Sequence, residues 1–214
     1  MERDSGRPMR YIIMCGGRYE KWKSPRQLTL CEGEPIVQRT IRLLREQGVS
    51  DIAISSDNPV FEEFGVPVLK HDNGFTAHQD NTCEGSWYDA FYPTDEPVCY
   101  LFGDVIFSPE AIRTIVGTET DDIEFFASAP PFAPEYPKEW AEPFALKVSD
   151  TERLKEAIRR TKKLKAQKRF WREPIMWELW QVLTGSRINH IDYHSYTVIN
   201  DYTCDIDDPE EEHL

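Results

Sequence analysis

The sequence predicts an α/β fold in which helices pack against a mostly parallel sheet. Short apolar segments rich in β-branched residues, at 11–15, 51–55 and 67–70, alternate with segments of helical periodicity. The connections between them are short, and this order implies parallel strands joined by right-handed crossovers. In such sheets ligands bind beyond the carboxyl ends of the strands, so we expect the functional site at that edge.

Length, charge and cysteine usage limit the class of protein. The 214 residues suffice for one full domain, which we expect over 10–214, behind an unstructured or artificial leader at 1–9. A net charge of −13 argues against nucleic-acid binding, which needs basic surfaces. No apolar run approaches the roughly 20 residues of a membrane helix, and no secretory signal opens the chain. The five scattered cysteines indicate reduced thiols, so we expect a cytoplasmic protein that does not bind membranes.

The first strand, at 11–15, ends directly in Gly16 and Gly17, and a cation-rich loop follows. Glycines let the backbone approach a ligand closely, and successive amides in such a turn can bind an anion. The cations Arg18, Lys21 and Arg26 would then neutralise phosphate oxygens. The alternative is a turn whose glycines serve backbone geometry only, with solvated cations around it.

The next elements continue the alternation of helix and strand. A helix is predicted at 35–48, with proline in its first turn and glycine at its end. The strand at 51–55 places Ser56 at the same edge as the glycines. A short helix at 60–64 and a strand at 67–70 follow. A polar loop at 71–81, too long for a bare connector, then leads to a helix start at 82–91.

The apolar segment 98–107 contains Gly103-Asp104, which places one carboxylate at the carboxyl end of a central strand. A carboxylate among apolar neighbours is costly unless it is paired or binds a metal. The alternative is a turn aspartate. Next we expect a helix that begins with Ser108 as its cap, followed by strands at 123–127 and 144–148.

The last third of the chain is predicted to contain helices at 152–167 and 173–180. Ten of the 25 Lys and Arg residues lie between Arg153 and Arg172. They form either a solvated helix face or a cationic flap over an anionic ligand. Trp177 and Trp180 are expected in the core, although they could stack on a ligand ring. The chain then ends in an acidic segment, which alone would indicate a solvated tail.

Taken together, these segments resemble the nucleotide-binding signature of the sugar-nucleotidyltransferase-like family. The resemblance is carried by Gly16-Gly17, Pro25-Arg26-Gln27-Leu28, Gly33-Glu34-Pro35-Ile36, Gly103-Asp104 and Asp205-Ile206-Asp207-Asp208-Pro209-Glu210-Glu211. It implies a GT-A, Rossmann-like three-layer sandwich. The chain departs from the family pattern at Tyr19, where a third glycine is usual, and at Arg26, where lysine is usual.

The resemblance also implies a function. A Mg²⁺-dependent nucleotidyltransferase would join an NTP, with CTP or UTP preferred, to a small phosphorylated acceptor such as a sugar 1-phosphate or a phosphocholine-like alcohol phosphate. Residues 130–190 would choose the acceptor, and a homodimer is possible. The implied triphosphate contacts are Gly16, Gly17, Arg18, Lys21 and Arg26; the implied nucleoside contacts are Ser56, Gly85 and Ser86; the implied metal ligands are Asp104, Asp205 and Asp207. For Gly85-Ser86, an ordinary helix cap is an equal alternative.

Two other functions stay open. A GT-A glycosyltransferase that uses a nucleotide sugar usually carries Asp-x-Asp after the fourth strand, but this chain reads Gly103-Asp104-Val105-Ile106 there. A nucleotide-binding relative without turnover is compatible with the altered glycine loop.

Overall fold

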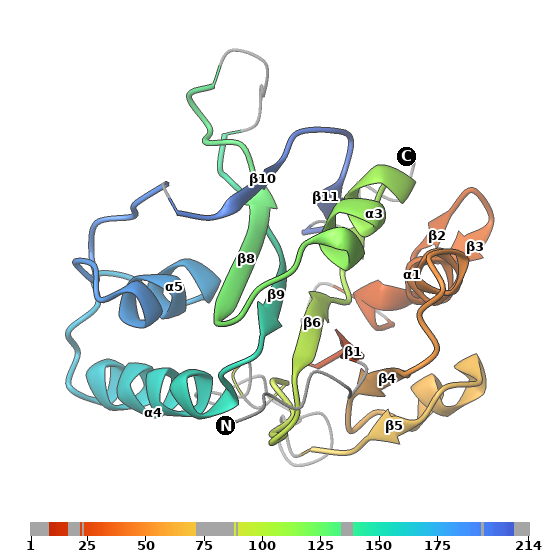
Figure 1. Ribbon diagram of the computed structural model, residues 1–214, viewed down its shortest axis with the longest axis horizontal. Coiled ribbons are helices and arrows are strands. Elements are labelled where there is room, and N and C mark those ends of the chain that lie inside the picture. Colours follow the sequence, from red (N-terminus) through yellow and green to blue (C-terminus); the bar gives the residue numbers. More distant parts are fainter. Residues whose placement is uncertain are drawn as a thin grey trace.

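The computed structural model describes residues 9–16, 22, 24–71, 88, 90–133, 139–193 and 195–207 (Figure 1). A seven-stranded sheet has the order β10-β8-β9-β6-β1-β4-β5. Its strands are β1 (Arg10–Met14), β4 (Ile52–Ser55), β5 (Val68–Leu69), β6 (Val98–Phe102), β8 (Ile123–Ser128), β9 (Pro143–Val148) and β10 (Thr197–Ile199). The helices are α1 (Ile36–Glu46), α3 (Pro109–Gly117), α4 (Thr151–Ala166) and α5 (Met176–Thr184), with short 3-10 helices η1 (Arg26–Leu28) and η2 (Pro59–Phe64).

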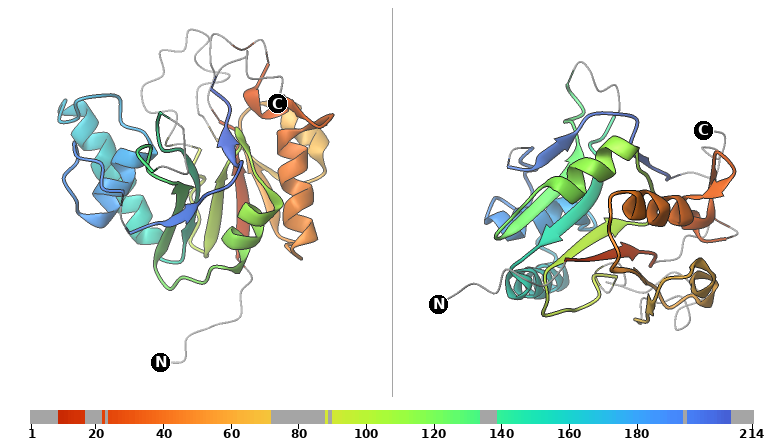
Figure 2. Two further views of the ribbon diagram at one scale, coloured as in Figure 1. Left: turned by 90° about the horizontal axis from the view of Figure 1, so that it is seen from above. Right: turned by 45° about the vertical axis from the view of Figure 1, so that its right-hand side comes forward.

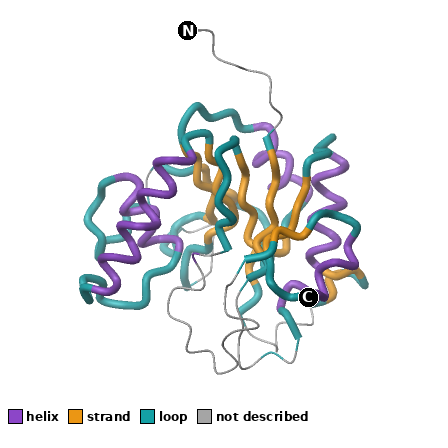
Figure 3. The backbone as a smooth tube through the Cα atoms, turned by 90° about the horizontal axis from the view of Figure 1, so that it is seen from below, coloured by secondary structure: helices purple, strands orange, loops and turns teal. Residues whose placement is uncertain are grey.

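The elements form three layers. Helices α4 and α5 cover one face of the sheet, and α1 and α3 cover the other (Figure 2). Seen from below, the strands lie side by side between these two helical layers (Figure 3). This arrangement confirms the predicted α/β class and the Rossmann-like three-layer sandwich.

The sheet is mostly parallel, as predicted, and β9 is the exception. It pairs antiparallel with both β6 and β8, whereas the other neighbouring strands pair parallel. A parallel neighbour needs a crossover connection, usually a helix. No helix is described between β8 and β9 in residues 129–133 and 139–142, so β9 returns beside β8 in the opposite direction.

Two small antiparallel ladders are separate from the main sheet. One joins β2 (Leu30–Cys31) to β3 (Glu34–Pro35), and the other joins β7 (Val105–Ile106) to β11 (Cys204–Asp205). The turn of the first ladder has Glu32 and Gly33 at φ of +54° and +81°. Positive φ at both central residues is typical of a tight hairpin turn with a type I′ backbone.

The centre of the sheet is buried on both faces, as a central parallel strand requires. All five residues of β6 are buried, and Ile12 and Ile13 of β1 have no exposed surface. Trp177 and Trp180 belong to this core at 3% and 5% exposure, and the Trp177 indole donates to the carbonyl of Ala141 at 3.0 Å. These two rings therefore stabilise the fold, as expected from the sequence.

Helix α5 begins at Met176, later than the predicted start at 173. Pro174 precedes the helix, and the backbone of Ile175 is extended. The carboxylate of Glu178 accepts a hydrogen bond from the amide of Ile175 at 2.9 Å, which satisfies a donor at the helix start.

Candidate active site

The carboxyl ends of β1 and β4 are joined next to Gly16. The amide of Cys15 donates to the carbonyl of Ser55 at 2.9 Å. The fully buried hydroxyl of Ser56 donates to the carbonyl of Cys15 at 2.8 Å and accepts from the amide of Asn58 at 3.1 Å. Ser56 thus lies at the predicted edge and connects two strands there. A nucleotide contact by its side chain stays a prediction.

Five of the predicted site residues lie outside the described part of the structure. They are Gly17, Arg18, Lys21, Gly85 and Ser86. Their assigned contacts with triphosphate and nucleoside therefore stay predictions.

Gly103 brings the end of β6 against the end of β1. Its amide donates to the carbonyl of Met14 at 3.0 Å. A Cβ atom at this position would lie 2.5 Å from that carbonyl oxygen and 2.8 Å from the Cys15 sulfur. Only glycine allows this close approach. The next residue, Asp104, is therefore held beside the end of β1.

The C-terminal segment returns to the same edge of the sheet. The amide of Ser108, the cap of α3, donates to the Thr203 hydroxyl at 3.0 Å, and the Ser108 hydroxyl donates to Asp201 at 2.5 Å. Strand β11 then pairs with β7, and the amide of Ile206 donates to the carbonyl of Asp104 at 3.0 Å. The tail is thereby placed directly alongside Asp104, as the sequence predicts.

Arg26 of η1 binds both Asp104, after β6, and the C-terminal segment. One terminal nitrogen, Nη2, lies 2.5 Å from Oδ2 of Asp104, and the other, Nη1, lies 3.0 Å from Oδ1 of Asp207. Nη1 also donates to the carbonyl of Ile206 at 2.9 Å. The Arg26 side chain is 6% exposed, whereas Asp104 and Asp207 are 21% and 78% exposed. A cation predicted to bind triphosphate thus lies between two residues predicted to bind metal.

A small apolar cluster contains residues of the same segments that Arg26 connects. Ile36, Ile106 and Ile206 are buried together with Cys31, and Trp22 from the glycine loop packs against them. The loop, the start of α1, β7 and β11 therefore share one packing unit. Burial of these side chains fixes the position of the tail.

The donors present fit a magnesium ion that arrives with a nucleotide. Among the described residues, no three His, Cys, Asp or Glu side chains form a metal-binding group. However, Mg²⁺ is commonly held by one or two carboxylates together with substrate phosphates. Asp104 and Asp207, both within reach of one guanidinium, supply such oxygens. The described contact of Asp205 is from its amide to the carboxylate of Glu142 at 3.2 Å, and its metal role stays a prediction.

The thiol beside Asp104 is not a nucleophile. Burial first, and the negative charge of Asp104 second, raise the pKa of the Cys15 thiol well above its usual value. The thiolate is the reactive form, so Cys15 stays a neutral apolar group near neutral pH.

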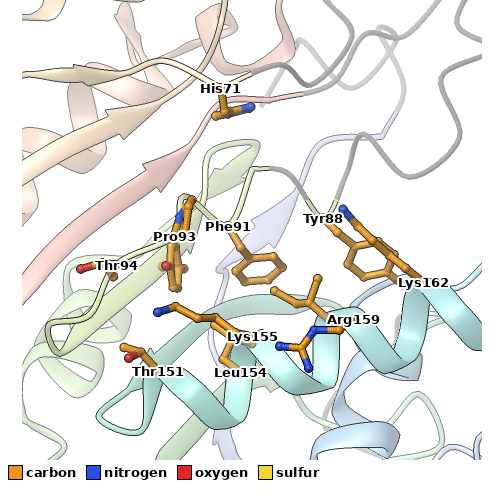
Figure 4. Close-up of a pocket in the computed structure, with 12 residues that line it drawn as sticks. His71, Tyr88, Phe91, Pro93, Thr94, Thr151, Leu154, Lys155, Arg159 and Lys162 are labelled. Carbon is orange, nitrogen blue, oxygen red and sulfur yellow. The ribbon is translucent and has the colours of Figure 1, made fainter.

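A cavity of about 520 Å³ lies against α4 (Figure 4). Tyr88, Phe91 and Tyr100 supply aromatic surface, and Lys155 and Arg159 of α4 supply positive charge. Lys155 is bound by Asp95 and Glu152, and Arg159 by Glu156. These local ion pairs favour the solvated-face interpretation for this part of the basic helix. The cavity includes none of the residues that hold Asp104.

The chain matches one known protein family over most of its length. The profile of the family described as "MobA-like NTP transferase domain" matches residues 11–175 of the chain. A comparison with curated protein sequences yields no match. Within the described residues, no helix combines the length and apolar character needed to cross a membrane.

Solved structures of nucleotidyltransferases share the fold. HddC from Yersinia pseudotuberculosis, solved with GMP-PN, aligns at a TM-score of 0.53 and 13% identity, covering 96% of this chain and 97% of that one. The inositol-1-phosphate CTP transferase from T. maritima aligns at 0.54 and 17%, covering 95% and 91%. A putative glucose-1-phosphate thymidylyltransferase from Bacillus anthracis, solved with sucrose, aligns at 0.53 and 16%, covering 92% and 89%. At these identities the likeness shows the fold alone. The family match over most of the length confirms the resemblance seen in the motifs: the chain belongs to the MobA-like NTP transferase family and is a nucleotidyltransferase domain.

Proposed function

We propose that this protein transfers a nucleotidyl group from an NTP to a phosphorylated acceptor and releases pyrophosphate, in a Mg²⁺-dependent reaction. The observation that supports this is the meeting of Arg26, Asp104 and Asp207 beside Gly16. These residues are distant in sequence, yet they gather at the sheet edge where α/β proteins bind ligands.

The reaction requires positioning more than covalent work by the protein. An oxygen of the acceptor phosphate attacks the α-phosphorus of the NTP, and the bond to the leaving pyrophosphate oxygen breaks. The acceptor phosphate is already ionised near neutral pH, so no side chain has to remove a proton. Catalysis then depends on alignment and on neutralising charge. Bound Mg²⁺ would supply charge neutralisation on the triphosphate oxygens.

The residues of the chain have distinct parts in this proposal. The amides of Gly16 and Gly17, with Arg18, Lys21 and Arg26, bind the triphosphate. Asp104 and Asp207, with Asp205 as a further candidate, hold the ion. Gly85 and Ser86 contact the nucleoside, and residues 130–190 select the acceptor. CTP or UTP is the proposed nucleotide, with a sugar 1-phosphate or an alcohol phosphate as acceptor. CTP transfer to inositol 1-phosphate, the activity in the name of the T. maritima neighbour, exemplifies this class.

A pyrophosphate-release assay tests the proposal. The four NTPs are combined with a panel of sugar 1-phosphates and alcohol phosphates, with and without Mg²⁺. We expect release that needs the NTP, the acceptor and Mg²⁺ together, and a loss of about a hundredfold or more in Asp104→Asn. Glu110→Gln, which changes an exposed carboxylate on α3, should behave as the parent. A parental rate in Asp104→Asn would refute the role of this carboxylate.

A second candidate is a nucleotide-binding protein without turnover. It is favoured by Arg26, whose guanidinium already neutralises Asp104 and Asp207. This candidate predicts Mg²⁺-dependent nucleotide binding without pyrophosphate under any acceptor. A glycosyltransferase would instead release the sugar from a nucleotide sugar, and the single aspartate after β6 does not favour it.

A further inference from the structure

Arg26 already holds the carboxylates to which the proposed reaction assigns a metal ion. Its two terminal nitrogens bind Oδ2 of Asp104 and Oδ1 of Asp207, at 2.5 and 3.0 Å. We propose that Arg26 is the resident counter-ion of this carboxylate pair in the nucleotide-free protein. A divalent cation therefore competes with the guanidinium for the same oxygens, and the site accepts metal only when Arg26 moves away.

Burial makes this competition strict. The guanidinium is 6% exposed, so water screens its charge poorly. A divalent cation on the same Asp104 oxygen would stand directly beside the buried guanidinium. Two cations so close repel each other where water screens them poorly. In the observed geometry Arg26 and a metal therefore compete for this oxygen.

The side-chain chemistry of arginine suits this role. Its planar fork binds two acceptors at once through separate nitrogens, whereas lysine offers one compact charge. Here the fork spans Asp104 and Asp207, and a further bond to the carbonyl of Ile206 holds it in place. An arginine at position 26 can therefore bind each carboxylate through a separate nitrogen, whereas a lysine has a single nitrogen for both.

A triphosphate gives the guanidinium an alternative partner. Arginine binds phosphate oxygens with the same bidentate geometry as carboxylates. When the nucleotide arrives, Arg26 can transfer from the carboxylates to the phosphate, and the ion can take its place. This second step rests on the proposed function. The competition between Arg26 and a cation does not, because it concerns the nucleotide-free protein only.

Titration of the nucleotide-free protein with Mn²⁺, followed by calorimetry, tests the competition. We expect Arg26→Gln to bind Mn²⁺ at least about tenfold more tightly than the parent, since the pair has lost its internal cation. Arg26→Lys should fall between them. Arg39→Gln is a matched control because Arg39 is also 6% exposed, but its described partners are the Phe107 carbonyl and the Tyr202 hydroxyl. It should bind Mn²⁺ as the parent does.

Thermal unfolding gives a second readout that needs no activity. Without metal, Arg26→Gln should unfold at a lower temperature than the parent, because the guanidinium that binds both carboxylates is gone. At one Mn²⁺ concentration, the ion should raise the midpoint of this variant by more than that of the nucleotide-free parent. In Arg26→Gln combined with Asp207→Asn, the gained Mn²⁺ affinity should disappear, which assigns the binding to this pair.

The outcomes separate the two proposals. Equal Mn²⁺ affinity in the parent and Arg26→Gln, at any strength, would overturn the competition. If Arg26→Gln does not fold without metal, the comparison of the parent with Arg26→Lys decides in the same way. Absence of pyrophosphate release with all acceptors would refute the proposed function alone, since the titration contains no nucleotide.

Discussion

Replacing Gly103 with alanine tests whether the close contact between β6 and β1 builds the site. The new Cβ would lie 2.5 Å from the Met14 carbonyl oxygen, whereas ordinary contacts begin at 3.4 Å. The chain at Asp104 must therefore move by almost 1 Å. This disturbs the 3.0 Å hydrogen bond from the Gly103 amide to the same oxygen.

The expected effects follow from this displacement. Overpacking of this kind costs about 1–3 kcal/mol, and a weakened hydrogen bond adds about 1 kcal/mol. For a chain of this size a total loss of about 2–4 kcal/mol lowers the unfolding midpoint by about 4–16 °C. A shift of about 1 Å at Asp104 should also reduce the rate of nucleotidyl transfer about a hundredfold.

Calorimetry and the pyrophosphate assay measure both effects. Gly117→Ala, at the end of α3, is the matched control because no atom lies within 4 Å of its added Cβ and its φ is not positive. We expect it to be neutral or slightly stabilising, by up to about 1 kcal/mol. The reasoning fails if Gly103→Ala unfolds at the parental temperature and keeps the parental rate.

Three further substitution and labelling experiments address the support of the site. Lys147 is 3% exposed and donates to three carbonyls at the end of α3. Lys147→Met should therefore lower the free energy of unfolding, measured in urea, by about 2 kcal/mol. The same change at the exposed Lys163 should leave it almost unchanged. Ser108→Ala removes both the cap of α3 and a contact to the C-terminal segment. It should lower the free energy of unfolding by about 1–2 kcal/mol and weaken Mg²⁺–NTP binding in calorimetry. Unchanged binding would argue against the anchoring role of Ser108. Burial raises the pKa of Cys99 to about 12, which lowers its thiolate fraction; iodoacetamide at pH 8 should label it in urea but not in the folded protein, as mass spectrometry would show.

Local sequence patterns predicted most of the fold. Continuous apolar runs identified β1 and β6 because a strand covered on both faces must be apolar throughout. The spacing of apolar residues identified α1, and the cap at Asp150 identified α4. The pairing of Gly103 with Asp104, and the similarity of the tail to a known motif, placed two distant carboxylates at one edge. The contact of both with Arg26 agrees with that placement.

The features that sequence reasoning missed depend on contacts between distant residues. No hairpin was predicted before the helix at 35–48, yet Glu32 and Gly33, both at positive φ, form the turn of the β2–β3 hairpin. Arg26 was expected on phosphate, and nothing local indicates that its fork spans Asp104 and Asp207. One signal could have shown this contact. The sequence places one cation and two anions in segments that were expected to meet.

The route of the tail has a consequence for biosynthesis. Residues 9–199 already contain every strand of the main sheet, whereas Asp207, one half of the carboxylate pair, arrives only with the last ladder. A nascent polypeptide can therefore acquire most of its architecture while the carboxylate pair is still incomplete. The pair cannot form until translation has passed Asp207, so a polypeptide that stops just before this residue would contain every strand of the main sheet but only one carboxylate of the pair.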